Sequence, residues 1–211
     1  MRPPTRATAR TCATAKTGLA WVMVLWAAGS CGRTAPPPEP GTSTGLAPDL
    51  RGRRVLLLPV QHVFGVPGDP DAELAFTLQD RGKSVMWVLP QEVEAVLARS
   101  PGVQASTRGL PVGTFLAAEV ERVGDPLYGQ LRRMAALVSA NAVLLPVVAS
   151  TDTQDDMLSA VRVTTALIEP RTGRVLWFGV SEGGAYPPDD PRGLASAMET
   201  VARTLLWYAR D

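Results

Sequence analysis

The sequence predicts a single α/β domain behind an export segment, with a mixed β-sheet of about five strands, a C-terminal β-hairpin and about four packing helices. Two almost continuous apolar runs, Arg54–Gln61 and Ala142–Ala149, are typical of strands that are covered on both faces. Three Asp-Pro pairs each precede a stretch of helical periodicity. A length of 211 residues, of which 45% are hydrophobic, suits one such domain.

The N-terminal segment has the features of a signal peptide. Residues 1–17 contain no acidic residue, and Leu19–Ser30 form an uncharged, mostly apolar run. This run is shorter than the roughly 20 residues that a membrane-spanning helix needs, which favours cleavage over a permanent transmembrane anchor. Four basic residues precede the run: Arg2, Arg6, Arg10 and Lys16.

The segment Ala27-Ala28-Gly29-Ser30-Cys31 resembles the lipobox of bacterial lipoproteins. The resemblance implies cleavage before Cys31, diacylglycerol on its sulfur and a further palmitate-type acyl chain, although Ala28 stands where leucine is commoner. Gly32 is not the aspartate that retains family members in the inner membrane, so the resemblance implies anchoring at the outer membrane, facing the periplasm. The alternative is an ordinary signal peptide, cut near Ala27 or Ser30, that leaves a free thiol.

Residues 31–50 are expected to form a lipidated cysteine and a flexible linker. Gly32–Leu50 contain five prolines and no bulky apolar pattern, which favours a semi-extended tether. A proline-rich ligand for a recognition domain is the alternative. We therefore divide the chain into a signal peptide (1–30), a linker (31–50) and a single periplasmic α/β domain (51–211).

The first half of the domain alternates strands and helices. Arg54–Gln61 is expected to be a strand that ends at Pro59 or runs at an edge. Asp69-Pro70 is expected to begin a helix that Gly82 closes. A strand at Ser84–Leu89 and a helix at Gln91–Ser100 follow, whereas Thr107–Arg122 fits neither pattern well.

The second half ends in a hairpin and a helix. A helix is expected after Asp125-Pro126, and Ala142–Ala149 is the next buried strand. Leu158–Glu169 and Arg174–Glu182 are joined by a turn sequence, Pro170–Gly173, and predict the hairpin. The last helix follows Asp190-Pro191 and carries the clearest apolar stripe of the chain: Leu194, Met198, Val201, Leu205 and Tyr208.

From Arg54 to Tyr208 this arrangement resembles the α/β domain of the TolB amino-terminal region, the CsgG-like secretion lipoproteins and the LpoB-type lipoproteins. The most specific match is Thr172–Trp177, which resembles the TGxVLW hairpin of these families. The resemblance implies a fold and a place in the cell envelope. It implies no chemistry, because the motif consists of turn and sheet residues.

Composition excludes several classes of function. Four of the 21 basic residues and none of the 20 acidic residues precede Cys31, so the remainder has a net charge of −3, which disfavours nucleic-acid binding. The cysteines are Cys12 and Cys31, and His62 is the single histidine. We therefore expect no metal site, no cofactor and no enzymatic activity.

Three motifs look chemical but have simpler explanations. Gly179–Gly183 fits G-x-S-x-G, yet Ser181 is followed by glycines and prolines rather than by a helix, and no histidine follows it. Two acidic groups lack a calcium-loop spacing and are explained by helix capping and by a solvated turn. These groups are Asp69, Asp71 and Glu73, and Asp152, Asp155 and Asp156.

Two residues are candidates for contact with a partner. His62 follows the first strand, and Trp207 lies at the end of the last helix, where it or Tyr208 must point away from the core. The expected function is that of a non-catalytic, lipid-anchored accessory protein that docks on an envelope protein. Alternatives are binding of a small ligand or glycan, and a subunit of a CsgG-like secretion assembly, for which the chain has no segment left to form long barrel hairpins.

Overall fold

The structure is a computed structural model that describes residues 43–117, 120–155 and 157–209. The expected signal peptide, Cys31 and the chain up to residue 42 lie outside these residues. No helix within the described ranges has the length and the hydropathy to cross a bilayer.

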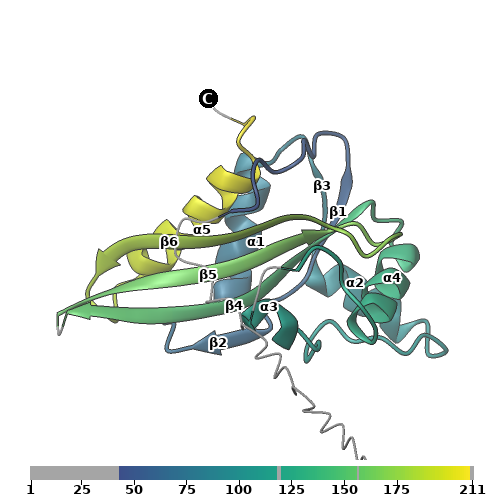
Figure 1. Ribbon diagram of the computed structural model, residues 1–211, viewed down its shortest axis with the longest axis horizontal. Coiled ribbons are helices and arrows are strands. Elements are labelled where there is room, and N and C mark those ends of the chain that lie inside the picture. Colours follow the sequence, from purple (N-terminus) through teal and green to yellow (C-terminus); the bar gives the residue numbers. More distant parts are fainter. Residues whose placement is uncertain (1–42, 118–119, 156, 210–211) are drawn as a thin grey trace, which may run out of the picture. The chain divides into compact units, whose positions relative to one another are not determined.

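The six-stranded mixed sheet confirms the predicted fold class (Figure 1). The main path runs β3-β1-β4-β5-β6, and β2 pairs with β4 beside this path. Parallel pairing joins β1 to β3 and β4, and β2 to β4, whereas β4, β5 and β6 are antiparallel neighbours. The strands are β1 (Arg54–Leu57), β2 (His62–Phe64), β3 (Met86–Val88), β4 (Ala142–Asp155), β5 (Leu158–Ile168) and β6 (Val175–Tyr186).

Strands β1 and β2 lie one after the other along the same edge of β4. Leu57 pairs with Leu144 and His62 with Val148; between them the Leu58 and Gln61 amides still donate to β4 carbonyls, and the regular pairing is interrupted only around Pro59. Pro59 lies in this gap and β1 ends before it, which confirms the expected end of the first strand. On β4 a bulge between Pro146 and Val148 accommodates Pro146 within the strand.

The Asp-Pro signals place two of the helices as expected. The Asp69 carboxylate accepts hydrogen bonds from the amides of Asp71 and Ala72 and caps α1, and Asp190 caps α5 through the amide of Arg192. At the remaining pair, Asp125-Pro126, the helix also follows as expected, but Pro126 rather than the aspartate takes the N-cap position of α4, and Asp125 accepts a hydrogen bond from the Gly129 amide. The helices are α1 (Pro70–Arg81), α2 (Pro90–Ala98), α3 (Gly113–Ala117), α4 (Leu127–Leu137) and α5 (Pro191–Leu205).

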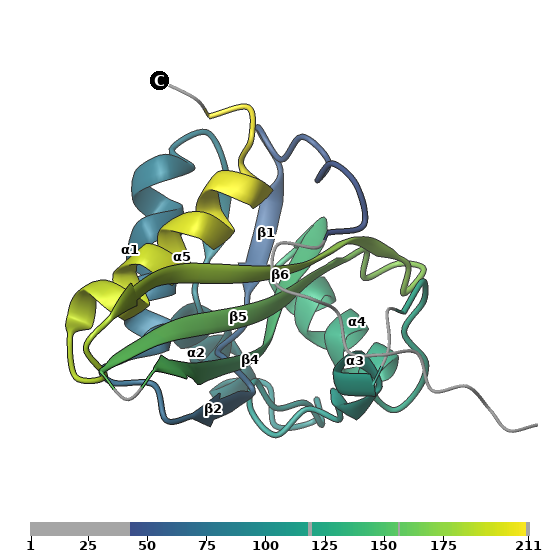
Figure 2. The same cartoon turned by 60° about the vertical axis from the view of Figure 1, so that its left-hand side comes forward.

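Helices cover both faces of the sheet. Because successive side chains of a strand point to opposite faces, each face has its own hydrophobic core. Val55 and Leu57 point into the core beneath α1 and α5, and Leu56 and Leu58 point into the core that contains α4 residues. Strand β6 contributes to both cores in the same way: Trp177 packs in the core beneath α1 and α5, and Phe178 packs in the core that contains α4 residues. Figures 1 and 2 show α1 beside α5, away from α3 and α4.

Two segments differ from the sequence expectation. Strand β4 continues to Asp155 and pairs with all of β5, so the expected hairpin is part of a three-stranded meander. Residues 43–50, which the sequence assigns to the linker, pack onto the domain: Ala47 and Leu50 are buried, and Ser43 forms a bridge with Gly179. Two well-spaced apolar residues are too few to produce a periodic signal.

Candidate functional site

The carboxyl edge of the parallel strands, where α/β proteins often bind ligands, is filled by the loop before α3. The Gln61 side-chain amide donates to the carbonyls of Pro59 (2.7 Å) and Thr107 (2.9 Å), and its oxygen accepts from the Leu110 amide (3.0 Å). Gln61 therefore holds the loop in place. A ligand contact by Gln61 would require these hydrogen bonds to break.

His62 begins the short edge strand β2 and does not lie in a loop. Its ring is stacked on that of Phe64, with centroids 6.1 Å apart and planes 9° apart, because alternate residues of a strand share a face. Phe64 is 59% exposed and Val63, on the opposite face, 44% exposed. We call His62, Val63 and Phe64 the β2 rim; its strand neighbour among the described residues is β4.

A second apolar surface lies at the turn between β4 and β5. Met157 is 74% exposed and Leu158 is 39% exposed. Neither these residues nor Phe64 is singled out by the sequence, because an apolar residue in a short strand or turn is normally read as part of the core. Solvent exposure, which depends on the tertiary fold, is what makes them candidates.

The G-x-S-x-G segment is sheet structure. Ser181 is buried within β6 and pairs with Val163 of β5. Gly183 lies so close to α5 that a β-carbon there would come within 2.5 Å of the Ser196 hydroxyl oxygen. The motif thus serves the packing of β6 against α5, and its serine lies in a strand rather than at a strand-to-helix elbow.

The acidic residues form caps and ion pairs. Besides the Asp69 cap, Asp71 accepts from the Val60 amide at 2.6 Å and pairs with Arg108 at 2.6 Å. Asp152 pairs with Arg162 at 2.8 Å. Within the described residues no group of three or more histidine, cysteine or acidic side chains is arranged to hold a metal ion.

Trp207 is half-buried at the end of α5. Its indole N–H donates to the carbonyl of Ala47 at 2.7 Å, and the next residue, Tyr208, accepts from the Leu50 amide at 3.2 Å. Burial raises the pKa of the Tyr208 phenol above its ordinary value. The rest of the Trp207 ring borders a surface hollow, so contact with a partner remains a prediction for this residue.

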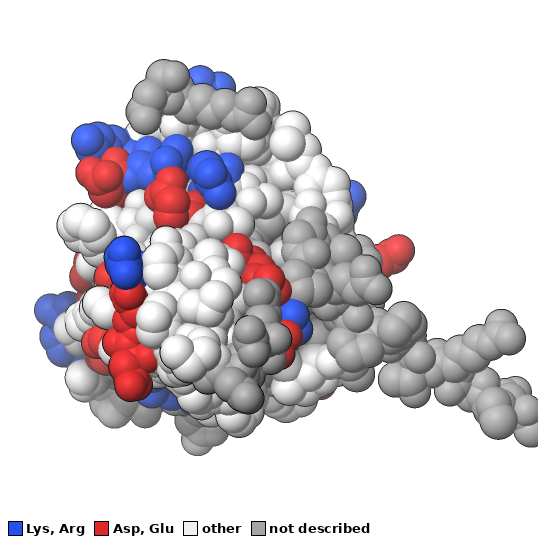
Figure 3. Space-filling model, turned by 90° about the vertical axis from the view of Figure 1, so that its left-hand side faces the viewer, with Lys and Arg blue, Asp and Glu red and all other residues white. Residues whose placement is uncertain are grey.

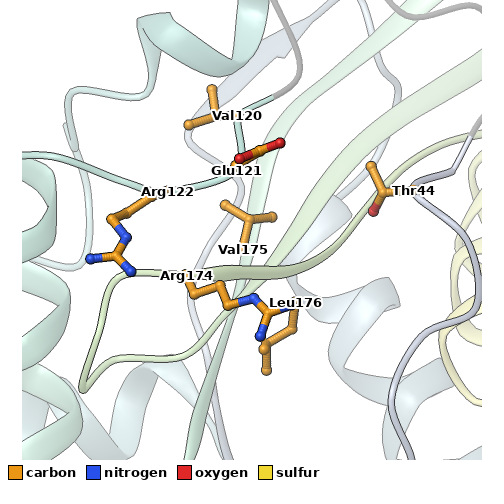
Figure 4. Close-up of a pocket in the computed structure, with 7 residues that line it drawn as sticks. All are labelled: Thr44, Val120, Glu121, Arg122, Arg174, Val175 and Leu176. Atoms are coloured by element: carbon orange, nitrogen blue, oxygen red, sulfur yellow. The ribbon is translucent and has the colours of Figure 1, made fainter.

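The pocket shown in Figure 4 is a gap between two segments that cover the outer edge of β6. On one side the Val175 amide donates to Glu121 (2.9 Å), and on the other the Thr44 amide donates to Phe178 (2.9 Å). Between them lies a pocket of about 420 Å³. Its lining combines two arginines with apolar side chains: Thr44, Val120, Glu121, Arg122, Arg174, Val175 and Leu176.

Comparison with known proteins gives structural likeness alone. No family model and no curated protein matches the chain. Among solved structures, the dodecamer of a PelC variant from Paraburkholderia phytofirmans is 16% identical with a TM-score of 0.45, over 78% of this chain and 94% of that one.

Two further structures come from lipoproteins. The LpoB C-terminal domain from Salmonella enterica is 19% identical (TM-score 0.41, 67% of this chain, 87% of that one). Lipoprotein GNA1162 from Neisseria meningitidis is 15% identical (TM-score 0.41, 65% and 85%). The LpoB-type resemblance seen in the sequence thus recurs, but at these scores we take no function from these proteins.

Proposed function

We propose that this chain is a lipid-anchored accessory protein of the cell envelope, held by Cys31, whose periplasmic domain docks on a protein partner and catalyses no reaction. The observation that carries the proposal is the β2 rim, where Val63 and Phe64 are exposed along the edge of a sheet and half-buried His62 stacks on Phe64. Exposed apolar side chains on a sheet edge are typical of surfaces that a partner covers.

The β2 rim fits an extended, apolar segment of the partner. A strand that is paired on one side leaves backbone N–H and C=O groups on the other, and a segment that adds there gains both hydrogen bonds and side-chain contacts. Phe64 and His62 would contact one face of such a segment and Val63 the other, since their side chains alternate. The partner class is therefore an envelope protein with an exposed extended segment.

The roles of the motif residues support a non-catalytic function. Ser181 is buried in β6, Asp69 caps a helix, and Asp71 is engaged with Val60 and Arg108. The loop that Gln61 holds occupies the usual position of an α/β active site.

A photocrosslinking amino acid at Val63 in the full-length protein, in intact cells, tests the docking surface. We expect one discrete crosslinked envelope protein, and we expect Phe64→Asp to abolish the product. The control is the same probe at Arg132, an exposed position on α4, which should capture no such protein. Equal capture from both positions, or a product unaffected by Phe64→Asp, would contradict docking at the β2 rim.

Binding of a small ligand or glycan is the second candidate, and the pocket between Arg122 and Arg174 favours it. Two guanidinium groups and the Glu121 carboxylate beside apolar side chains suit a ligand that combines an anionic group and a hydrogen-bond donor with an apolar portion. Thermal unfolding with a panel of cell-wall fragments tests this function. A fragment that raises the melting temperature of the wild type but not of Arg174→Ala would establish it, whereas no shift with any fragment would count against it.

A further inference from the structure

Charged side chains are segregated along the domain. One end holds six basic residues, Arg51, Arg53, Arg54, Arg81, Lys83 and Arg203, and three acidic ones, Asp49, Asp80 and Glu199. The other described residues contain nine basic and thirteen acidic side chains. Figure 3 shows a group of Lys and Arg near the top of one face, with some Asp and Glu beside it, and mostly Asp and Glu with a few basic residues in the middle and lower parts.

Contacts between neighbouring elements hold the six residues, called the basic end below, at one place in the fold. The Met86 amide donates to the Arg53 carbonyl, the Gly52 amide donates to Ser84, and the Arg54 amide donates to Asn141 at the start of β4. The Arg51 guanidinium lies 5.1 Å from the ring centre of Tyr208, after α5. The basic end is thus built from the amino ends of β1, β3 and β4 and the carboxyl ends of α1 and α5.

The basic end carries a net charge of +3, whereas the other described residues together carry −4. Among the described residues, Arg53 and Arg54 form no ion pair, and both are exposed. At the opposite end of the sheet Arg108, Arg162 and Arg192 are each paired with a carboxylate. Unpaired arginines also occur elsewhere, but there the acidic residues outnumber the basic ones, so the net positive charge of the described residues lies at the basic end.

Exposed apolar side chains accompany these charges. Leu46 is 67% exposed and Met86 is 52% exposed, and Leu46 and Trp207 line a hollow of about 700 Å³ together with Arg81 and Arg203. Arginine and lysine beside leucine, methionine and tryptophan are the composition of surfaces that lie at a membrane interface. The mixture distinguishes this end from a merely solvated charged face.

The tether also leads to the basic end. Ser43, the first described residue, lines the same hollow as Arg81 and Arg203. The chain between Cys31 and Ser43 can span at most about 40 Å when fully extended, so a lipid on Cys31 keeps this end close to the bilayer. Within the volume that the tether allows, an anionic membrane surface attracts a basic patch when the two are about 10 Å apart or less, which is the screening length at moderate salt.

We infer that the basic end lies on the anionic phospholipid surface into which the Cys31 lipid inserts, and that this contact turns the β2 rim away from the membrane. The inference rests on the lipid anchor of the proposed function and adds an orientation to it. Strand β4 begins beside Arg54, and β2 pairs with its middle residues, Val148–Ser150, roughly 20 Å along the strand. The domain would then present its apolar rim to partners in the periplasm.

Energy transfer from the protein to a headgroup dye tests the orientation, with the full lipidated chain reconstituted in vesicles. After lipidation of Cys31 the mature sequence has no other cysteine, so Ser84→Cys at the basic end and Ala185→Cys on β6 can be labelled singly. In phosphatidylcholine vesicles containing phosphatidylglycerol, we expect stronger transfer from position 84 than from position 185. The difference should shrink in pure phosphatidylcholine and at high salt.

Charge reversal provides matched variants. Arg53→Glu, Lys83→Glu and Arg203→Glu combined should abolish the difference between the two labels, and circular dichroism should show that the variant remains folded. A control variant makes the same change in net charge at exposed positions outside the basic end: Arg99→Glu, Arg132→Glu and Arg171→Glu combined. This variant should preserve the difference in energy transfer between the two labels.

Equal transfer from both labels in the wild type, with the protein bound to the vesicles, would overturn the orientation alone. Failure of the wild-type chain to stay on the vesicles, or labelling of Cys31 itself, would overturn the lipid anchor and with it this inference.

Discussion

The indole N–H of Trp207 donates a hydrogen bond to the carbonyl of Ala47 at 2.7 Å. This contact joins the last helix to the segment that enters the domain from the linker, and buried Leu50 packs in the same core. The two ends of the domain are thereby fixed to each other. A force transmitted through the tether would act on α5 as well as on β1.

Replacing Trp207 with phenylalanine tests this connection. We expect a loss of about 1 kcal/mol in the free energy of unfolding, because the Ala47 carbonyl loses its donor while an aromatic ring is retained. Urea unfolding followed by circular dichroism measures the change. As a control, Phe76→Ala on α1, where the side chain is 67% exposed, should change stability by less than about 0.5 kcal/mol. Equal effects of the two substitutions would contradict the role given to Trp207.

The Asp69 cap makes a second prediction. Asp69→Ala removes the acceptor of the Asp71 and Ala72 amides and should destabilise the domain by about 1 kcal/mol. Asp80→Ala, an exposed change near the other end of the same helix, should have little effect. Urea unfolding of both variants makes the comparison, and a neutral Asp69→Ala would show that solvent replaces the cap.

The contact between β6 and α5 predicts that Gly183 tolerates no side chain. A β-carbon at Gly183 would lie 2.8 Å from the Ala197 amide nitrogen and 2.8 Å from the Gly193 carbonyl oxygen, and backbone atoms of a packed helix cannot move away freely. Gly183→Ala should cost about 1–3 kcal/mol. Gly102→Ala, where no atom lies within 4 Å of the new β-carbon, is the matched control. Unchanged melting temperatures for both variants would mean that β6 and α5 are further apart than described.

The cap of α5 predicts a dependence on pH. The Arg192 guanidinium and amide hydrogen-bond to Asp190 and lower the pKa of its carboxyl below the ordinary value of 3.8. A carboxyl with a lowered pKa stabilises the fold above 3.8 and loses this effect as the pH falls through its folded-state pKa. Asp190→Asn should therefore flatten the acid limb of a plot of stability against pH. An NMR titration that places the Asp190 carboxyl at or above its ordinary value would contradict the prediction.

Local signals account for the parts of the fold that the sequence predicts. Asp69 and Asp190 act through hydrogen bonds to residues two or three positions away, and the turn before Arg174 is closed by the Gly173 amide, which donates to the Glu169 carbonyl. Strand β2 has no comparable local signal, because its three residues form a strand through pairing with β4, far along the chain. Thr151 and Asp152 are polar and extend β4 for the same reason, since β5 supplies their partners.

The candidate surfaces also differ in whether local sequence or tertiary structure reveals them. His62 and Trp207 are singled out by residue type and position, and the structure places His62 on the β2 rim and Trp207 beside the hollow with Arg81. Phe64 is not predicted, because its exposure depends on the position of β2 at the sheet edge. The basic end also depends on tertiary structure, since it unites residues from both ends of the domain.

Lipid attachment to Cys31 is the central claim, and metabolic labelling with a radioactive fatty acid tests it most directly. The wild-type protein should carry the label and remain with the membrane fraction, whereas Cys31→Ala should lose both properties. An unlabelled wild-type protein, or a Cys31→Ala protein that is still labelled, would contradict the account.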